Sequence, residues 1–171
     1  MLFDWLNKLS IKLDPLRPPG AVDEKEFLQK CTRCRKCVEV CPYNTIKIAH
    51  GESGVMMGTP YIEAREMPCY LCEDFPCIEA CPSEALSPVE SKEEVKMGIA
   101  VIDESLCLPY NGILCRACYE RCPIYREAVT LKDNLYPVVH EDKCVGCGIC
   151  VNVCPAETVA ISIVSKNKGI Y

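Results

Sequence analysis

The sequence CVGCGICVNVCP, residues 144–155, places four cysteines at the spacing C-x2-C-x2-C-x3-C and follows the last one with proline. Residues 31–42, CTRCRKCVEVCP, repeat this pattern without deviation. Two further groups stretch it, with a four-residue gap at the centre of residues 69–82 and a seven-residue opening loop in residues 107–123. Thiolate is the soft ligand that each iron of a 4Fe-4S cube needs, and a curled loop with this spacing can hold three corners. The chain therefore repeats one metal-binding unit.

All sixteen cysteines are candidate ligands, enough for four 4Fe-4S clusters. In two-cluster ferredoxins the fourth cysteine of a group ligates the other cluster, so the groups must pair. The two outer groups share the compact spacing and the two inner groups the stretched one, which favours a nested pairing. The predicted ligand sets are Cys31, Cys34, Cys37 and Cys154; Cys144, Cys147, Cys150 and Cys41; Cys69, Cys72, Cys77 and Cys122; and Cys107, Cys115, Cys118 and Cys81. Sequential pairing, first with second and third with fourth, is the alternative.

Two other uses of cysteine compete with iron-sulfur clusters. Zinc sites also use C-x2-C pairs, but they need two pairs with a longer gap and no closing Cys-Pro. Disulfide frameworks belong mostly to secreted proteins, and residues 1–13, MLFDWLNKLSIKL, resemble neither a secretory leader nor a twin-arginine signal. No apolar run approaches the roughly 18 to 20 residues of a membrane-spanning helix. The sequence therefore predicts a cytoplasmic protein that does not span the membrane.

The expected fold class is α+β, built from tandem bacterial ferredoxin-like units with little regular secondary structure around the clusters. Apolar β-formers flank the cysteine groups and predict short strands, and a helical turn is expected before each Cys-Pro. These strand segments are residues 45–48, 98–102, 129–131, 136–140 and 159–163. The predicted organisation is an amphipathic, Pro-rich docking segment at 1–27, an outer two-cluster module at 28–66 and 136–171, and an inner module at 67–135.

Several functions are disfavoured by the sequence. A net charge of −5 argues against nucleic acid as a partner. There is no G-x-G-x-x-G after a strand, no P-loop and no catalytic-triad pattern. We therefore expect no catalytic residues and no organic substrate, and the chemistry is expected to belong to partner proteins.

Longer stretches between the cysteines resemble the ferredoxin-type subunits of the NapG/MauM kind, associated with periplasmic nitrate reductase and methylamine utilisation. The stretches that carry the resemblance are Arg17-Pro-Pro-Gly20, Gly58-Thr-Pro-Tyr61, Arg65-Glu-Met-Pro-Cys69, Cys72-Glu-Asp-Phe-Pro-Cys77, Ala80-Cys-Pro-Ser83 and Met97-Gly-Ile-Ala-Val101. The resemblance implies four 4Fe-4S clusters and an electron-transfer subunit. The family commonly carries a twin-arginine signal, which this sequence lacks. Small four-cluster subunits of similar design accompany tungsten- or molybdenum-pterin aldehyde oxidoreductases, which suggests such an enzyme as partner.

The predicted function is a polyferredoxin subunit that relays single electrons between a catalytic redox subunit and a flavoprotein, quinone enzyme or ferredoxin. Two alternatives stay open: an iron-sulfur storage or assembly protein, and a quinol electron relay of the nitrate-reductase type. Arg33, Arg35 and Lys36 in the first cysteine group contrast with Glu73 and Asp74 in the second. These charges either shift the reduction potentials of nearby clusters or are only solvated surface residues.

Overall fold

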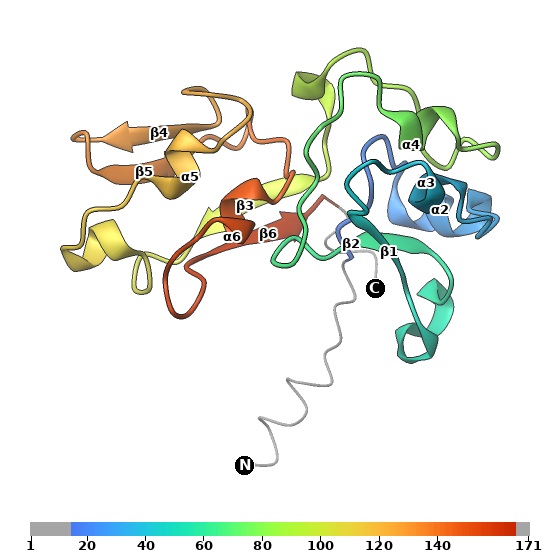
Figure 1. Ribbon diagram of the computed structural model, residues 1–171, viewed down its shortest axis with the longest axis horizontal. Coiled ribbons are helices and arrows are strands. Elements are labelled where there is room, and N and C mark those ends of the chain that lie inside the picture. The colour runs from blue at the N-terminus through green and yellow to red at the C-terminus, as the bar shows by residue number, and fades with distance from the viewer. Residues whose placement is uncertain (1–14, 167–171) are drawn as a thin grey trace.

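The computed structural model describes residues 15–166 as two halves that lie side by side (Figure 1). Residues 1–14 and 167–171 lie outside the described residues, and with them the apolar start of the predicted docking segment. None of the described helices is long and apolar enough to cross a membrane.

The first half, blue to green in Figure 1, is built on a central antiparallel strand pair. Its elements are α2 (Glu24–Lys30), α3 (Lys36–Glu39), β1 (Ile46–Ile48), the 3-10 helix η1 (Gly51–Met56), β2 (Pro60–Ile62) and α4 (Pro76–Glu79). The Asp23 side chain caps α2 by accepting a hydrogen bond from the Glu26 N–H. An isolated bridge between Ala21 and Leu86 ties the beginning of this half to its end.

The second half, yellow to red, repeats this topology with longer strands. After the connecting 3-10 helix η2 (Lys92–Glu94) come β3 (Gly98–Ile102), η3 (Leu108–Asn111), α5 (Ala117–Glu120), β4 (Val129–Lys132), β5 (Tyr136–Val139), α6 (Ile149–Asn152) and β6 (Ile161–Ser165). Strands β4 and β5 form the central pair, and β3 pairs antiparallel with β6. The β3–β6 pair takes the place of the Ala21–Leu86 bridge, so each half is one ferredoxin-like unit.

The predicted nested modules are wrong, because each half contains two consecutive cysteine groups. β1 and β2 join the first group to the second as a local antiparallel pair, and β4 and β5 join the third to the fourth. Pairing neighbouring groups closes only short loops, whereas nesting would close a loop across most of the chain at a greater cost in entropy. Similar cysteine spacing therefore did not indicate which groups lie together.

Residues 15–27, the described part of the predicted docking segment, pack into the first half. The guanidinium of Arg17 is 1% exposed and is ion-paired with Glu24. Its Nε donates to Glu24 Oε2 over 2.9 Å, and its Nη1 donates to Thr59 Oγ1 over 2.9 Å and to the Pro60 carbonyl over 2.6 Å. The same guanidinium lies over the Phe27 ring, 4.6 Å from its centroid. This buried pair fastens the entering chain to α2 and β2.

Hydrogen bonds from side chains to backbone carbonyls hold the two halves together. Arg65 Nη1 donates to the carbonyls of Val151 (3.0 Å), Asn152 (3.3 Å) and Cys154 (3.1 Å), oxygens at the end of α6 that lack helical partners. In return, Asn152 Nδ2 donates to the Arg65 carbonyl over 3.0 Å. At Gly148, with φ +84, an added Cβ would lie 2.5 Å from Ala64 Cβ. The halves therefore meet where only glycine fits.

Replacing this glycine is expected to loosen the junction. Gly148→Ala combines a left-handed backbone with a clash, whereas Gly112→Ala, at φ +80, meets no atom within 4 Å and isolates the backbone cost. We expect Gly112→Ala to lower the free energy of unfolding by about 1 to 2 kcal/mol. Gly148→Ala should lower it by a further 1 to 3 kcal/mol, roughly the cost of overpacking. Anaerobic denaturant titration measures both, and equal losses would argue against a tight junction.

Candidate iron-sulfur sites

Each cysteine group follows the same local plan. The helices α3, α4, α5 and α6 are four residues long, and the third cysteine of each group is the second residue of its helix: Cys37, Cys77, Cys118 and Cys150. The fourth cysteine of each group comes directly after the helix C-cap: Cys41, Cys81, Cys122 and Cys154. The following proline cannot continue the helix, so the chain turns away and the fourth cysteine reaches a different pocket from the third.

Three pockets are each lined by four cysteines. We call them site 1 (Cys31, Cys34, Cys37 and Cys81), site 2 (Cys41, Cys69, Cys72 and Cys77) and site 4 (Cys107, Cys115, Cys118 and Cys154). The rest of the lining is mainly apolar at sites 2 and 4, as with Pro19, Ile46, Ile62 and Phe75 around site 2. Site 1 combines apolar residues such as Phe27 and Leu86 with Arg33 and Arg35. An apolar wall with four converging sulfurs is the surrounding that an iron-sulfur cluster needs.

The remaining four cysteines form site 3 (Cys122, Cys144, Cys147 and Cys150). Burial raises the pKa of Cys147 to about 12, and the neighbouring Cys122 and Cys144 add to the rise. Burial also raises the pKa of Cys150, with further contributions from Cys147 and Cys144. The Ala100 N–H points at Cys144 Sγ over 3.4 Å. Such hydrogen bonds to sulfur are one way in which a protein tunes a cluster potential.

In each ligand set predicted from the sequence, the structure replaces the fourth cysteine by one from a neighbouring group. The structure gathers the first three cysteines of each group, but it exchanges the fourth between neighbouring groups. Cys154 lies at site 4 rather than with Cys31, and Cys81 lies at site 1 rather than with Cys107. Cys41 lies at site 2, and Cys122 interacts with Cys144. The cause is the sequential pairing of the groups within each half.

Burial disfavours the charged thiolate form of several of these cysteines. Burial raises the pKa of Cys37, Cys69 and Cys77 to about 12, so these thiols are neutral at pH 7 unless a metal displaces the proton. None of the sixteen cysteines is in a disulfide. Four sulfurs around one pocket fit a multi-iron cube, whose irons lie at its corners.

The four sites follow one another in a row. Helices α3 and α4, which carry Cys37 and Cys77, pack against each other, so site 1 and site 2 are neighbours. The Cys69 N–H donates to the Cys147 carbonyl over 2.9 Å, so site 2 lies directly against site 3 across the junction. Cys118 is near enough to affect Cys150, which links site 3 to site 4. The order is thus 1, 2, 3, 4, with sites 2 and 3 at the centre.

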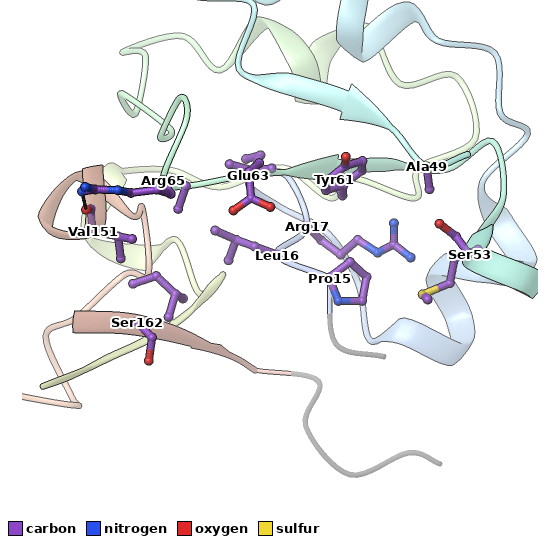
Figure 2. Close-up of a pocket in the computed structure, with 14 residues that line it drawn as sticks. Pro15, Leu16, Arg17, Ala49, Ser53, Tyr61, Glu63, Arg65, Val151 and Ser162 are labelled. Atoms are coloured by element: carbon purple, nitrogen blue, oxygen red, sulfur yellow. Dashed lines mark hydrogen bonds between the residues drawn. The ribbon is translucent and has the colours of Figure 1, made fainter. Parts of the chain in front are cut away.

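A separate cavity of about 380 Å³ lies at the junction of the halves (Figure 2). Leu16, Tyr61 and Arg65 line it from the first half, and Val151 and Ser162 from the second. No cysteine is among its described lining residues. It is therefore distinct from the four cysteine sites.

Known families match both halves. Residues 30–85 and residues 100–161 each match a 4Fe-4S dicluster domain, and each range contains two consecutive cysteine groups. The fold and the cysteine sites thus define the class: a ferredoxin-type electron-transfer protein made of two tandem dicluster domains.

Individual relatives narrow the assignment. The chain is 45% identical over 168 residues to the ferredoxin-type protein NapG of Escherichia coli (strain K12), covering 90% of this chain and 73% of the relative. It is 42% identical over 164 residues to the methylamine utilization ferredoxin-type protein MauM of Methylorubrum extorquens, covering 91% and 74%. The ferredoxin-type protein NapF of Escherichia coli (strain K12) is 30% identical over 149 residues, covering 84% and 82%. The chain belongs to the NapG/MauM family of ferredoxin-type proteins, as the resemblance predicted.

Sequence reasoning missed the residues that hold the halves in place. Arg65 belongs to a stretch that indicated only the family, yet its side chain donates to three carbonyls at the end of α6. Arg17 was assigned to a docking segment, yet it is buried with Glu24. The seven-residue spacing of Arg17 and Glu24, on either side of a Pro-Pro-Gly turn, was the available signal.

Proposed function

We propose that the chain holds four 4Fe-4S clusters at sites 1 to 4 and relays single electrons along this row. Each cluster, when bound, accepts and gives up one electron at a time. The catalytic step belongs to a partner, so the chain acts as an electron-transfer subunit between a catalytic redox subunit and a second carrier. The backbone hydrogen bond between Cys69 and Cys147 carries the proposal, because it makes the two dicluster halves one continuous row.

The residues of the chain would serve the relay in three ways. The cysteines hold the irons, and the apolar walls of the pockets keep water from the sulfurs, which sets the potentials. Buried backbone donors such as the Ala100 N–H stabilise negative charge on sulfur. The rigid junction fixes the spacing between the central sites.

The partner and the location are further parts of the proposal. By analogy with small four-cluster subunits, the partner is a large tungsten- or molybdenum-pterin oxidoreductase, and the relay operates in the cytoplasm. Co-purification of the partner with the native protein tests the first part, and separation of the cytoplasmic and periplasmic fractions of the cell tests the second. The competing proposal of a storage or assembly protein predicts clusters that stay oxidised while the partner turns over. Electron paramagnetic resonance during turnover distinguishes the two.

Paired cysteine variants are expected to identify the ligand sets. Cys31 and Cys81 line the same pocket, so Cys31→Ala with Cys81→Ala should remove one cluster. The iron content should fall from about sixteen to about twelve atoms per chain. Cys31 and Cys154 line different pockets, so the pair Cys31→Ala with Cys154→Ala should remove two clusters and leave about eight irons. Iron and acid-labile sulfide assays on anaerobically purified protein give the counts.

The reverse result would restore the nested pairing. If the variant pair at Cys31 and Cys154 retained about twelve irons and the pair at Cys31 and Cys81 only about eight, the ligand sets proposed here would be wrong. A wild-type chain with far fewer than about sixteen irons would contradict the four-cluster proposal itself.

A further inference from the structure

Two arginines in the loop of site 1 adopt a backbone conformation that normally belongs to glycine. Arg33 has φ +57 and Arg35 has φ +64, and both side chains are exposed. The matching residues of the fourth cysteine group are Gly146 and Gly148, at φ +71 and +84. A left-handed backbone is unfavourable for any residue that carries a Cβ, yet Leu71 and Phe75 also adopt it at the matching positions of the second group.

The difference between the two loops has a simple spatial reason. Gly146 and Gly148 are buried, and an added Cβ would lie 2.3 Å from the Gly98 nitrogen or 2.5 Å from Ala64 Cβ. The loop of site 1 lies at the surface, where a side chain has room. The available space allows an arginine side chain there. It gives no reason to prefer arginine, because glycine would adopt the same backbone without strain. What sets this loop apart from the loops of the second and fourth groups is the positive charge of Arg33, Arg35 and Lys36.

Arg33 and Arg35 connect site 1 to an open groove of about 570 Å³. Both residues line the pocket of site 1 and also the groove. The other groove residues among the described side chains are Ile48, Ala49, His50, Gly51, Gly54, Val55, Met57 and Gly58, and none of these is a carboxylate. Val55 and Met57 are 69% and 55% exposed beside the arginines. Within site 1, Cys34 is exposed. We call this surface, formed by Arg33, Arg35 and the groove residues just named, the arginine face.

We propose that the arginine face docks an acidic redox protein and is the port through which electrons enter or leave site 1. The proposal rests on the relay function proposed above. In the entering direction the partner is oxidised by one electron and the site 1 cluster is reduced by one, with no proton or bond transferred. Positive charges around an exposed cluster would attract and orient a partner whose surface is acidic.

The opposite end of the row has a different surface. Beside Cys115 of site 4, Ile113 and Leu114 are 56% and 73% exposed, and Tyr125 is also exposed. Arg116, Arg121 and Arg126 are exposed at this end as well, but the exposed carboxylates Glu120 and Glu127 adjoin the last two in the sequence. Residues 33–36 carry three cations and no carboxylate. The denser positive charge therefore favours site 1 as the port for an acidic partner.

A protein fits the arginine face better than an anionic membrane does. The chain carries a net charge of −5, to which oxidised clusters with their thiolates add further negative charge, so an extended anionic surface would repel most of the molecule. A small acidic protein would contact only this face. Exposed apolar residues among charges, such as Val55 and Met57, are also the arrangement of protein interfaces, which have an apolar centre and a polar rim.

The test uses a reduced, acidic plant-type ferredoxin as a probe for the holoprotein. Stopped-flow spectroscopy would measure the electron-transfer rate, and a binding titration with the redox-inactive, metal-substituted probe would measure affinity. The variants are Arg33→Gln with Arg35→Gln, and Arg33→Gly with Arg35→Gly, which relieves the backbone strain. Arg121→Gln with Arg126→Gln is the matched control, because it removes the same charge from exposed positions near site 4.

Both variant pairs at the arginine face should slow the reaction about tenfold at low ionic strength and weaken binding in parallel. The difference in rate between the wild type and these variants should shrink at about 1 M salt, where the Debye screening length is about 3 Å. The control pair should behave as wild type. Unchanged rates in both arginine-face pairs, an equal loss in the control, or no reaction of the wild type with the probe would overturn the proposal.

Two further measurements distinguish failure of the relay function, failure of the docking port, and binding to a membrane. Dithionite is small and needs no docking surface, so it should reduce the clusters of every variant equally. Failure of dithionite to reduce the wild-type clusters would count against the relay function, whereas a loss confined to the probe reaction would support the port. Sedimentation with phosphatidylserine vesicles should leave the protein in solution. Co-sedimentation that is lost in the arginine-face variants would instead assign the face to a membrane and overturn the proposal.

Discussion

Removing iron and sulfide is expected to unfold the chain. Four helices consist of four residues each, far below the roughly 12 residues at which an isolated helix becomes even marginally stable. Each therefore needs an anchor, and each carries a cysteine as its second residue. The described core itself contains Cys37, Cys77, Cys144, Cys147 and Cys150. Without clusters the pockets between the elements would lack their contents, so metal binding and folding should be one process.

The measurement compares the holoprotein with protein treated anaerobically with a chelator and an oxidant. Far-ultraviolet circular dichroism and protease resistance should both fall to the values of an unfolded chain. Adding iron and sulfide back should restore them together with the absorbance of the clusters, which controls for irreversible damage. An iron-free chain with native protease resistance would show that the apolar core is sufficient to hold the fold.

Glu24→Gln is expected to lower the free energy of unfolding of the holoprotein by about 3 to 5 kcal/mol. The substitution keeps the shape of the side chain but leaves the Arg17 guanidinium buried with an uncompensated charge. That charge cannot reach water, because Arg17 is 1% exposed, and the Thr59 hydroxyl and Pro60 carbonyl compensate it only in part. Anaerobic denaturant titration, followed by the cluster absorbance, measures the change.

Two controls test the cause of this effect. Lys30→Gln breaks the exposed i,i+4 pair between Lys30 and Glu26 on the same helix and should leave stability unchanged within error. Arg17→Met with Glu24→Leu removes both charges and should cost less than Glu24→Gln alone, since no buried charge remains unpaired. If the double variant were the less stable of the two, the hydrogen bonds of Arg17 rather than its charge would be the source of stability.

The arginine face and the ligand sets bear on the same question, namely how electrons cross the molecule. Within the proposed row, sites 2 and 3 lie at the junction and sites 1 and 4 lie at the ends. Arg33 and Arg35 mark one end with positive charge, whereas Ile113 and Leu114 mark the other with exposed apolar area. Different surfaces at the two ends would allow two different partners to use the relay without competing for one site.

Local features of the fold follow closely from the sequence. Glycine, alanine and β-branched residues at 98–102 predicted a strand that the structure places at Gly98–Ile102, and Val129–Lys132 and Tyr136–Val139 lie within a residue of the predicted segments. The helical turn before each Cys-Pro is also present, although it begins a little earlier than expected, at Lys36 and Ile149. These features depend on a few neighbouring residues, so a short stretch of sequence determines them.

The cysteine pattern by itself indicated iron-sulfur clusters and which three cysteines of each group lie together, because a single loop, compact or stretched, brings its own thiols to one point. Which fourth cysteine completes each set was decided only by the tertiary structure. Cys81 and Cys154 each come after a four-residue helix and are each followed by proline. Their local sequence does not indicate which pocket each one reaches. The antiparallel pairing of β1 with β2 and of β4 with β5 decides it, since these contacts bring neighbouring groups together at the smallest cost in chain entropy.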